Sequence, residues 1–181
     1  NNTMALVNDP EACRLAALGD LRQCLAFAEE IGDVQTIEGA DPHLEIGALY
    51  ELSLEREFPP ILLFDNIKGY PKGRRVAVNV RSSKVFDVGA KGLELVQNYR
   101  KHRRANSEPI PPTMVATGPV LENVQEGDAI DAFAFPAPQW HEADGGRYIG
   151  TECLVITKDP DSDWVNCGTY RVMIHDKKTL V

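Results

Sequence analysis

Long apolar runs are missing from this sequence, and none approaches the roughly 20 residues that a transmembrane helix needs. The first residues also show neither the charged nor the apolar region of a secretory signal peptide. Basic residues are few, with 19 Lys and Arg against 27 Asp and Glu, for a formal net charge of −8. Binding to nucleic acid requires a basic face that displaces counterions. We therefore expect a cytoplasmic protein with neither a membrane nor a nucleic-acid partner.

Motifs for zinc, nucleotides and hydrolytic triads are missing as well. The cysteines form no CxxC pair and the histidines share no metal-ligand spacing. Neither a Walker nor a Rossmann glycine pattern occurs. We expect three of the cysteines to be small buried side chains and the histidines to be cap, surface or strand residues. The cysteines are Cys13, Cys24 and Cys153, and the histidines are His43, His102, His141 and His175.

The composition that remains is typical of a globular protein, with 43% hydrophobic and 25% charged residues in 181. Helical spacing of apolar residues and helix-capping signals predict helices at Pro10–Ile31, 42–55 and Val88–Arg104. The first of these is expected to divide at Gly19-Asp20, with Asp20 as the cap of the second part. Apolar runs predict strands at Val34–Ile37, Ile61–Phe64, Val76–Val80, Val120–Val124, Ala132–Phe135, Tyr148–Thr157 and Cys167–Ile174.

A proline-rich stretch, residues 105–119, reads as an extended linker. It predicts two domains, a mixed α/β lobe over 1–108 and a β-rich region over 109–181. A basic run, Arg100–Arg104, ends the preceding helix, where cations suit the negative end of the helix dipole. The same run is open to a second interpretation, contact with a partner or with nucleic acid.

The segment Pro136–Arg171 contains the most informative pattern. Two apolar runs flank Lys158–Asp163, whose Asp, Pro and Ser residues favour a turn between two strands. At the start of the second strand, Asn166, Thr169 and Arg171 stand beside the small residues Cys167 and Gly168. Small residues let a ligand approach the backbone, and an Arg fork suits phosphate or carboxylate. This pattern fits either an anion site or an ordinary solvated strand edge.

Three motifs in this region occur in a fixed order: Asp-Gly-Gly-Arg-Tyr-Ile (144–149), Asp-Pro-Asp (159–161) and Asn-Cys-Gly-Thr-Tyr-Arg (166–171). Two earlier stretches accompany them, Val-Gln-Thr-Ile-Glu-Gly-Ala-Asp-Pro-His-Leu-Glu-Ile-Gly (34–47) and Leu-Phe-Asp-Asn-Ile-Lys-Gly-Tyr-Pro (63–71). Together they resemble the UbiD family of carboxy-lyases. The resemblance implies reversible decarboxylation of an aromatic or α,β-unsaturated acid with prenylated FMN. It also implies an α+β fold, a mixed α/β lobe followed by the start of a split β-barrel of the flavin reductase type.

The resemblance assigns roles to residues of the second strand. Asn166 would be a ligand of Mn²⁺ or Mg²⁺, and the carbonyl of Trp164 would bind K⁺. Gly168, Thr169, Tyr170 and Arg171 would line the cofactor, with Arg171 as the catalytic arginine. Without the resemblance, Asn166 would instead be read as a hydrogen-bonding turn residue and Tyr170 as a core aromatic.

Three hypotheses about function follow from the sequence. In the first, the chain is the N-terminal part of a decarboxylase, inactive until the rest of the enzyme, with its glutamates and further metal ligands, joins it. That rest would be the same polypeptide or a second chain, and a homo-oligomer is expected when the enzyme is complete. In the second, the chain is a non-catalytic domain without bound cofactor. In the third, it is a flavin reductase-like barrel that uses ordinary FMN.

Overall fold

The computed structural model describes residues 19–86, 90–105 and 113–181. They belong to two compact units: unit 1 draws on Asn1–Gln35, Arg56–Ile61 and Asn79–Asp128, and unit 2 on Thr36–Glu55, Leu62–Val78 and Ala129–Val181. Some predictions lie outside the described residues. These are the first part of the helix from Pro10, the burial of Cys13, the side chain of His102, and Pro109, Pro111 and Pro112 of the linker. The domain boundary at 108/109 also falls there and stays a prediction.

Helix α3, Leu21–Glu30, begins as the sequence predicts. The Asp20 side chain accepts a hydrogen bond from the backbone N–H of Gln23 at 2.8 Å, which satisfies one of the free donors of the first turn. The helix ends before Gly32, whose φ of +70° lies in the left-handed region that glycine adopts without strain. The cap and the stop are both local signals.

Helix α4, Glu45–Ser53, begins three residues later than the motif Asp41-Pro42 predicts. Asp41 and Glu45 explain the delay, because their side chains bind backbone N–H groups of the intervening turn. Asp41 accepts from His43 N at 2.9 Å, and Glu45 accepts from Asp41 N at 2.7 Å. Leu44 then has a φ of +69°, which excludes a regular helical turn at that position.

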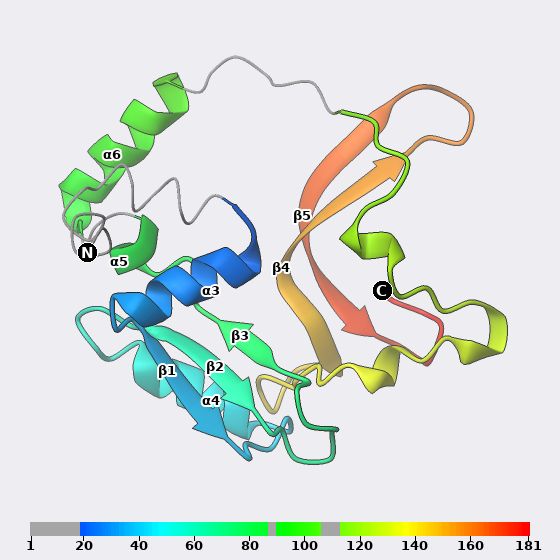
Figure 1. Cartoon of the computed structure of the whole chain (residues 1–181), viewed down its shortest axis with the longest axis horizontal. Helices are drawn as coiled ribbons and strands as arrows, with labels where there is room; N and C mark the ends of the chain where they lie inside the picture. Colours follow the sequence, from blue (N-terminus) through cyan, green and yellow to red (C-terminus); the bar gives the residue numbers. More distant parts are fainter. Residues whose placement is uncertain (1–18, 87–89, 106–112) are drawn as a thin grey trace. The chain divides into compact units, whose positions relative to one another are not determined.

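Three strands form one sheet in the order β1-β2-β3, with β1 at Val34–Glu38, β2 at Ile61–Asp65 and β3 at Val76–Val78 (Figure 1). Strands β2 and β3 are antiparallel, and Leu63 pairs with Ala77. The first four residues of β2 are buried, as expected for a continuous apolar run. Strand β3 ends two residues before the predicted end, since Asn79 has a φ of +57°.

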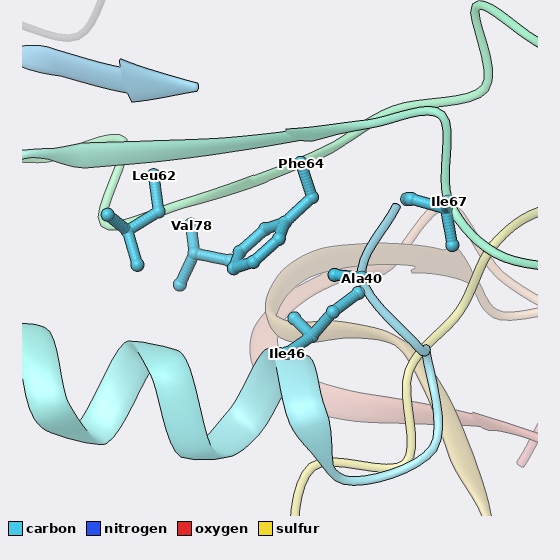
Figure 2. Packing of buried hydrophobic residues seen from close by; sticks show 6 residues of the cluster. All are labelled: Ala40, Ile46, Leu62, Phe64, Ile67 and Val78. Carbon is cyan, nitrogen blue, oxygen red and sulfur yellow. The ribbon is translucent and has the colours of Figure 1, made fainter. Parts of the chain in front are cut away.

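The core of unit 2 lies between α4 and this sheet. Figure 2 shows Phe64 and Leu62 of β2 and Val78 of β3 above Ile46 of the helix. Buried Gly47 lets the chain at Trp140 approach the helix closely, because a Cβ at this position would lie 2.0 Å from the Trp140 carbonyl oxygen. The α4 helix is thereby packed against the chain segment that leads into the second sheet.

Unit 1 has its own small core around α3, made of Cys24, Phe27, Ala28, Ile61 and Val85. Beside it, the buried carboxylate of Asp33 accepts a hydrogen bond from the Ser82 hydroxyl and lies 3.2 Å from Lys84 Nζ. The predicted helix Val88–Arg104 is observed from Gly92, as α6, Gly92–Ala105. A separate short helix, α5, covers Ser83–Phe86.

The second sheet is a long antiparallel hairpin of β4, Arg147–Lys158, and β5, Val165–Ile174. Both strands and the intervening turn are confirmed. In the turn, Asp159 accepts hydrogen bonds from Asp161 N at 2.9 Å and from Ser162 Oγ at 3.0 Å. The pairing of β4 with β5 shifts in register on both sides of Gly150, which places bulges near the start of β4.

The predicted strands Val120–Val124 and Ala132–Phe135 are wrong. The chain forms 3₁₀ turns there: η1 at Pro119–Leu121, η2 at Gly127–Ala129 and η3 at Ala132–Ala134. Pro119 at the first position fixes a helical φ, and Asp131 caps η3 by accepting from Phe133 N at 3.0 Å. The described fold is therefore mixed α/β with two small sheets.

Candidate functional site

The residues that the family resemblance selects all lie on or beside β5. Successive side chains of a strand alternate between its faces, so Asn166, Gly168 and Tyr170 share one face of the hairpin. Thr169 and Arg171 lie on the other face, where Thr169 pairs with Leu154 of β4. The expected cofactor residues are thus neighbours along one strand, but their side chains lie on two opposite faces of the hairpin.

Asn166 is half-buried and pairs with Thr157 across the hairpin. Its side-chain amide makes no hydrogen bond to any other described residue, so the interpretation as a hydrogen-bonded turn residue finds no support. Its oxygen is a hard, neutral donor of the type that Mn²⁺ and Mg²⁺ accept. Within the described ranges, no group of three or more His, Cys, Asp or Glu side chains gathers at one point. Among the described residues, Asn166 therefore offers a single potential metal ligand with no cluster of His, Cys, Asp or Glu beside it.

The carbonyl oxygen of Trp164, the expected K⁺ ligand, accepts a hydrogen bond from Asp159 N at 3.0 Å. A carbonyl oxygen has two lone pairs, so one remains for a cation. Trp164 as a whole residue is 64% exposed.

The ring of Tyr170 lies across Gly168. A Cβ built on Gly168 would be 2.4 Å from Tyr170 Cε2, so only glycine leaves room for this ring position. The Tyr170 side chain is 53% exposed. It is therefore a surface aromatic, and its interpretation as a core residue is wrong.

Arg171 is exposed, and its guanidinium carbon lies 5.4 Å from the centroid of the Tyr148 ring. A ring at this distance attracts the cation and orients the planar guanidinium. The same face of the hairpin carries two exposed aliphatic side chains, Leu154 and Ile156. An arginine beside an apolar surface suits a ligand that combines an anionic group with a hydrocarbon body.

Other predicted residues lie apart from this strand. Cys24 is buried, as expected, but Cys153 is only half-buried, and its side chain lies over Gly150 at the bulge. His141 is exposed and lies 2.8 Å from Glu51, as expected of a surface histidine. His175 is exposed at the end of β5.

A pocket of about 390 Å³ in unit 2 was not anticipated from the sequence. Its lining comes from three separate parts of the chain: Pro42, His43, Gly69, Tyr70, Phe133, Gln139 and Arg147. Backbone hydrogen bonds join two of these parts, the one at Pro42 and the one at Gln139. Leu44 N donates to Gln139 O, and Gln139 N donates to Pro42 O, both at 2.9 Å.

Arg147, the first residue of β4, is the charged group of this pocket. Its Nε donates to the Ala137 carbonyl at 2.9 Å, and its Nη2 donates to the Tyr70 hydroxyl. The guanidinium carbon lies 5.6 Å from the ring centroids of both Tyr70 and Phe133. Burial lowers the pKa of the Arg147 guanidinium, because partial removal from water disfavours its charged form.

The sequence did carry a signal for this pocket. Arg147 belongs to the motif at 144–149, and most of the other lining residues belong to the two earlier stretches that accompany it. The motifs are family markers in the sequence, and nothing in their spacing indicates that they meet in space.

Comparison with known proteins matches two family models. Residues 25–85 match the N-terminal domain of 3-octaprenyl-4-hydroxybenzoate carboxy-lyase (UbiD_N), and residues 113–181 match its Rift-related domain (UbiD). Pyrrole-2-carboxylic acid decarboxylase of Pseudomonas aeruginosa is 33% identical over 176 residues, which cover 89% of this chain and 35% of that protein.

Solved structures are similar as well. Vanillic acid decarboxylase of Sedimentibacter hydroxybenzoicus, solved with a truncated second component, has a TM-score of 0.74 at 29% identity and covers 89% of this chain. A UbiD-class enzyme of Pelotomaculum thermopropionicum in complex with FMN has a TM-score of 0.66 at 29% identity and covers 88%. The chain spans 36% and 35% of these two proteins, about a third of the length of the relatives it matches.

In the described part of the chain, no helix has both the length and the apolar character that crossing a membrane requires.

Proposed function

Because this chain belongs to the UbiD family of carboxy-lyases, we propose that it is the cofactor-binding part of a decarboxylase of aromatic or α,β-unsaturated acids. The observation that carries the proposal is the β5 strand. It presents a free amide oxygen at Asn166, a side-chain-free position at Gly168 beneath the Tyr170 ring and an exposed guanidinium at Arg171 within six residues. The relatives named as decarboxylases of pyrrole-2-carboxylic and vanillic acid support an aromatic acid as the substrate.

The proposed cofactor is prenylated FMN, and the relative in complex with FMN supports a flavin. When bound, prenylated FMN supplies the electron sink that decarboxylation needs, since loss of CO₂ leaves negative charge on carbon. Asn166 would ligate a divalent cation, Mn²⁺ or Mg²⁺, at the flavin phosphate. The Trp164 carbonyl would bind K⁺ through its remaining lone pair, and the split β-barrel around the flavin belongs to the same proposal.

Arg171 is proposed as the catalytic arginine. Its exposed guanidinium would bind the substrate carboxylate in a bidentate manner, and the adjoining Leu154 surface would contact the hydrocarbon part. A fixed positive charge at this point stabilises negative charge that develops during the reaction. Thr169 and Tyr170 would line the cofactor on either side of the strand.

The proposed site also needs residues that the described chain does not bring to β5. The family resemblance implies two catalytic glutamates, together with a further histidine and glutamate as metal ligands. We place these on the remainder of the enzyme, either in the same polypeptide or in a second chain. By this proposal the 181-residue chain is inactive by itself, and the complete enzyme is a cytoplasmic homo-oligomer.

One observation favours a second function, a non-catalytic domain that binds no cofactor. A single neutral amide oxygen is a poor metal site, and the described residues offer no acidic or histidine cluster beside it. The third hypothesis is a reductase that uses ordinary FMN. The sequence contains no nicotinamide-binding motif that would support it.

The intact mass and the ultraviolet–visible spectrum of the purified protein test these alternatives together. A longer polypeptide or a co-purifying chain, with prenylated-flavin absorbance and CO₂ release from an aromatic acid, is the expected result. A folded, colourless protein that gains no flavin when reconstituted with the missing part would contradict the proposal. Bleaching of a bound flavin by NADH would identify the reductase instead.

A further inference from the structure

The pocket around Arg147 contains a cation that its surroundings leave incompletely paired. A guanidinium has five N–H donors, and two of them bind the Ala137 carbonyl and the Tyr70 hydroxyl. The other three have no hydrogen-bond acceptor among the described residues. No carboxylate of the described residues forms an ion pair with Arg147 either. The positive charge therefore has neutral partners only.

Leaving such a charge partly buried costs free energy, because the guanidinium loses water without gaining an anion. The depressed pKa of Arg147 has this same cause. An anion that entered the pocket would recover the lost interaction through charge-assisted hydrogen bonds, which are stronger than neutral ones. The guanidinium is already positioned to bind an anion, because two hydrogen bonds and two aromatic rings fix Arg147.

The rest of the lining indicates what kind of anion fits. Phe133, Tyr70 and Pro42 supply ring and aliphatic surface, and Gln139 and His43 are neutral or weakly basic groups. A volume of about 390 Å³ is within the range of small-molecule sites. One guanidinium matches one negative charge, whereas a phosphate dianion would leave a second charge poorly paired in an apolar setting. Gln139 is already engaged, since its Nε2 lies 3.4 Å from the carbonyl oxygens of both His141 and Asp144.

We propose that this pocket is a binding site for a small aromatic carboxylate, with the carboxylate on Arg147 and the ring of the ligand against Phe133 and Tyr70. The site is formed entirely by unit 2 and contains no residue of β5. It therefore differs from the proposed substrate position at Arg171 and does not depend on the proposed decarboxylase function. If that function holds, the site would bind an acid of the same chemical class as the substrate.

Titration of the isotope-labelled chain with benzoate, followed by amide chemical shifts at constant ionic strength, tests the proposal. We expect saturable shifts at Gly69, Tyr70 and Gln139, and nuclear Overhauser contacts between the benzoate ring and Phe133. Arg147→Gln should weaken binding about tenfold or more, and Arg147→Lys less, because an ammonium keeps the charge but lacks the fork. Exposed Arg75 provides the matched control, and Arg75→Gln should leave the affinity unchanged.

Two comparisons make the result decisive. Acetate and inorganic phosphate are titrated under the same conditions, and both should bind more weakly than benzoate; equal affinity for phosphate would overturn the aromatic carboxylate as the ligand. Loss of benzoate binding in Arg171→Gln but not in Arg147→Gln would place the acid on β5 and also overturn the proposal. If Arg147→Gln fails to fold, two other results test the site. One is the affinity of Phe133→Leu for benzoate, which should be lower, and the other is the set of nuclear Overhauser contacts between benzoate and Phe133 in the unaltered protein. Linear shifts without saturation would mean that no such site exists.

Discussion

The guanidinium of Arg171 stacks near the ring of Tyr148, with 5.4 Å between its central carbon and the ring centroid. The two residues come from different strands, so the contact spans the β4–β5 hairpin. At an exposed site such a pair contributes about 0.5–1 kcal/mol, enough to favour one orientation of a long side chain. Arg171 forms no ion pair with any residue in the part of the chain that the structure describes. Its charge is held in place and is available to an anion.

Replacement of Arg171 by Ala in the complete enzyme should abolish decarboxylation while the flavin still binds. Loss of a charge that stabilises a developing anion typically costs a factor of about 10²–10³ or more in kcat. The measurement is CO₂ release from the acid substrate, together with the flavin absorbance of the purified variant. Tyr148→Phe serves as the control, because it keeps the ring and its contact with the guanidinium. An active Arg171→Ala enzyme would refute the catalytic assignment.

Gly47 should not tolerate even a methyl group. A Cβ there would lie 2.0 Å from the carbonyl oxygen of Trp140, a backbone atom that cannot rotate away. Gly47→Ala should therefore lower the free energy of unfolding by roughly 1–3 kcal/mol, the usual range for an overpacked core. Urea denaturation gives the measurement. Gly145→Ala is the matched control, since its added Cβ would meet only Met173 Sδ at an ordinary 3.6 Å. An equal change in both variants would show that this close approach does not govern stability.

Local signals were enough to predict several elements of the fold. The Asp20 cap locates the start of α3, and the buried run of β2 and the hairpin follow from apolar patterns with a turn between them. The failures lie where short apolar runs meet contacts that are distant in sequence. Ala132, for example, donates its N–H to the carbonyl of Lys177, which stabilises a 3₁₀ turn that the run itself does not favour.

The same distinction applies to the candidate sites. The strand from Asn166 to Arg171 could be placed by pattern and resemblance, because all its residues are neighbours in sequence. The Arg147 pocket could not, since its guanidinium binds the hydroxyl of Tyr70, 77 residues earlier. Nor did alternation by itself reveal that the Tyr170 ring covers Gly168, which depends on a side-chain rotamer.

The ion pair between Asp41 and Lys68, 2.7 Å long, should make stability depend on pH at both extremes. The hydrogen bond that Lys68 donates lowers the pKa of Asp41 below the usual 3.8, and Asp41 raises the pKa of Lys68 above 10.5. A lowered carboxyl pKa adds stability above about pH 4 that is lost as the pH falls through the folded value. A raised amine pKa adds stability below about pH 10.5 that is lost as the pH rises through the folded value.

The test is the difference in unfolding free energy between the wild-type protein and Lys68→Gln, measured across this range. We expect a constant difference between about pH 5 and about pH 9 that shrinks toward both ends. Asp41→Asn is the companion variant, because its side-chain oxygen can still accept the hydrogen bond from His43 N. A difference that persists unchanged at acid pH would mean that Lys68 acts through another contact.

The described thiols should react in the order of their exposure, with Cys167 first and Cys24 last. Cys24 is 4% exposed, and burial raises its pKa, so less of it is thiolate at any given pH. Its Sγ also lies 3.9 Å from the Val80 carbonyl, which holds the thiol inside the core of unit 1. With iodoacetamide near pH 8, peptide mapping should show Cys24 labelled at least about tenfold more slowly than Cys167. In denaturant the two rates should converge, because both thiols then approach the same pKa. Fast labelling of Cys24 without denaturant would show that α3 opens readily, since the thiol reaches solvent only when the Phe27 and Val85 packing is lost.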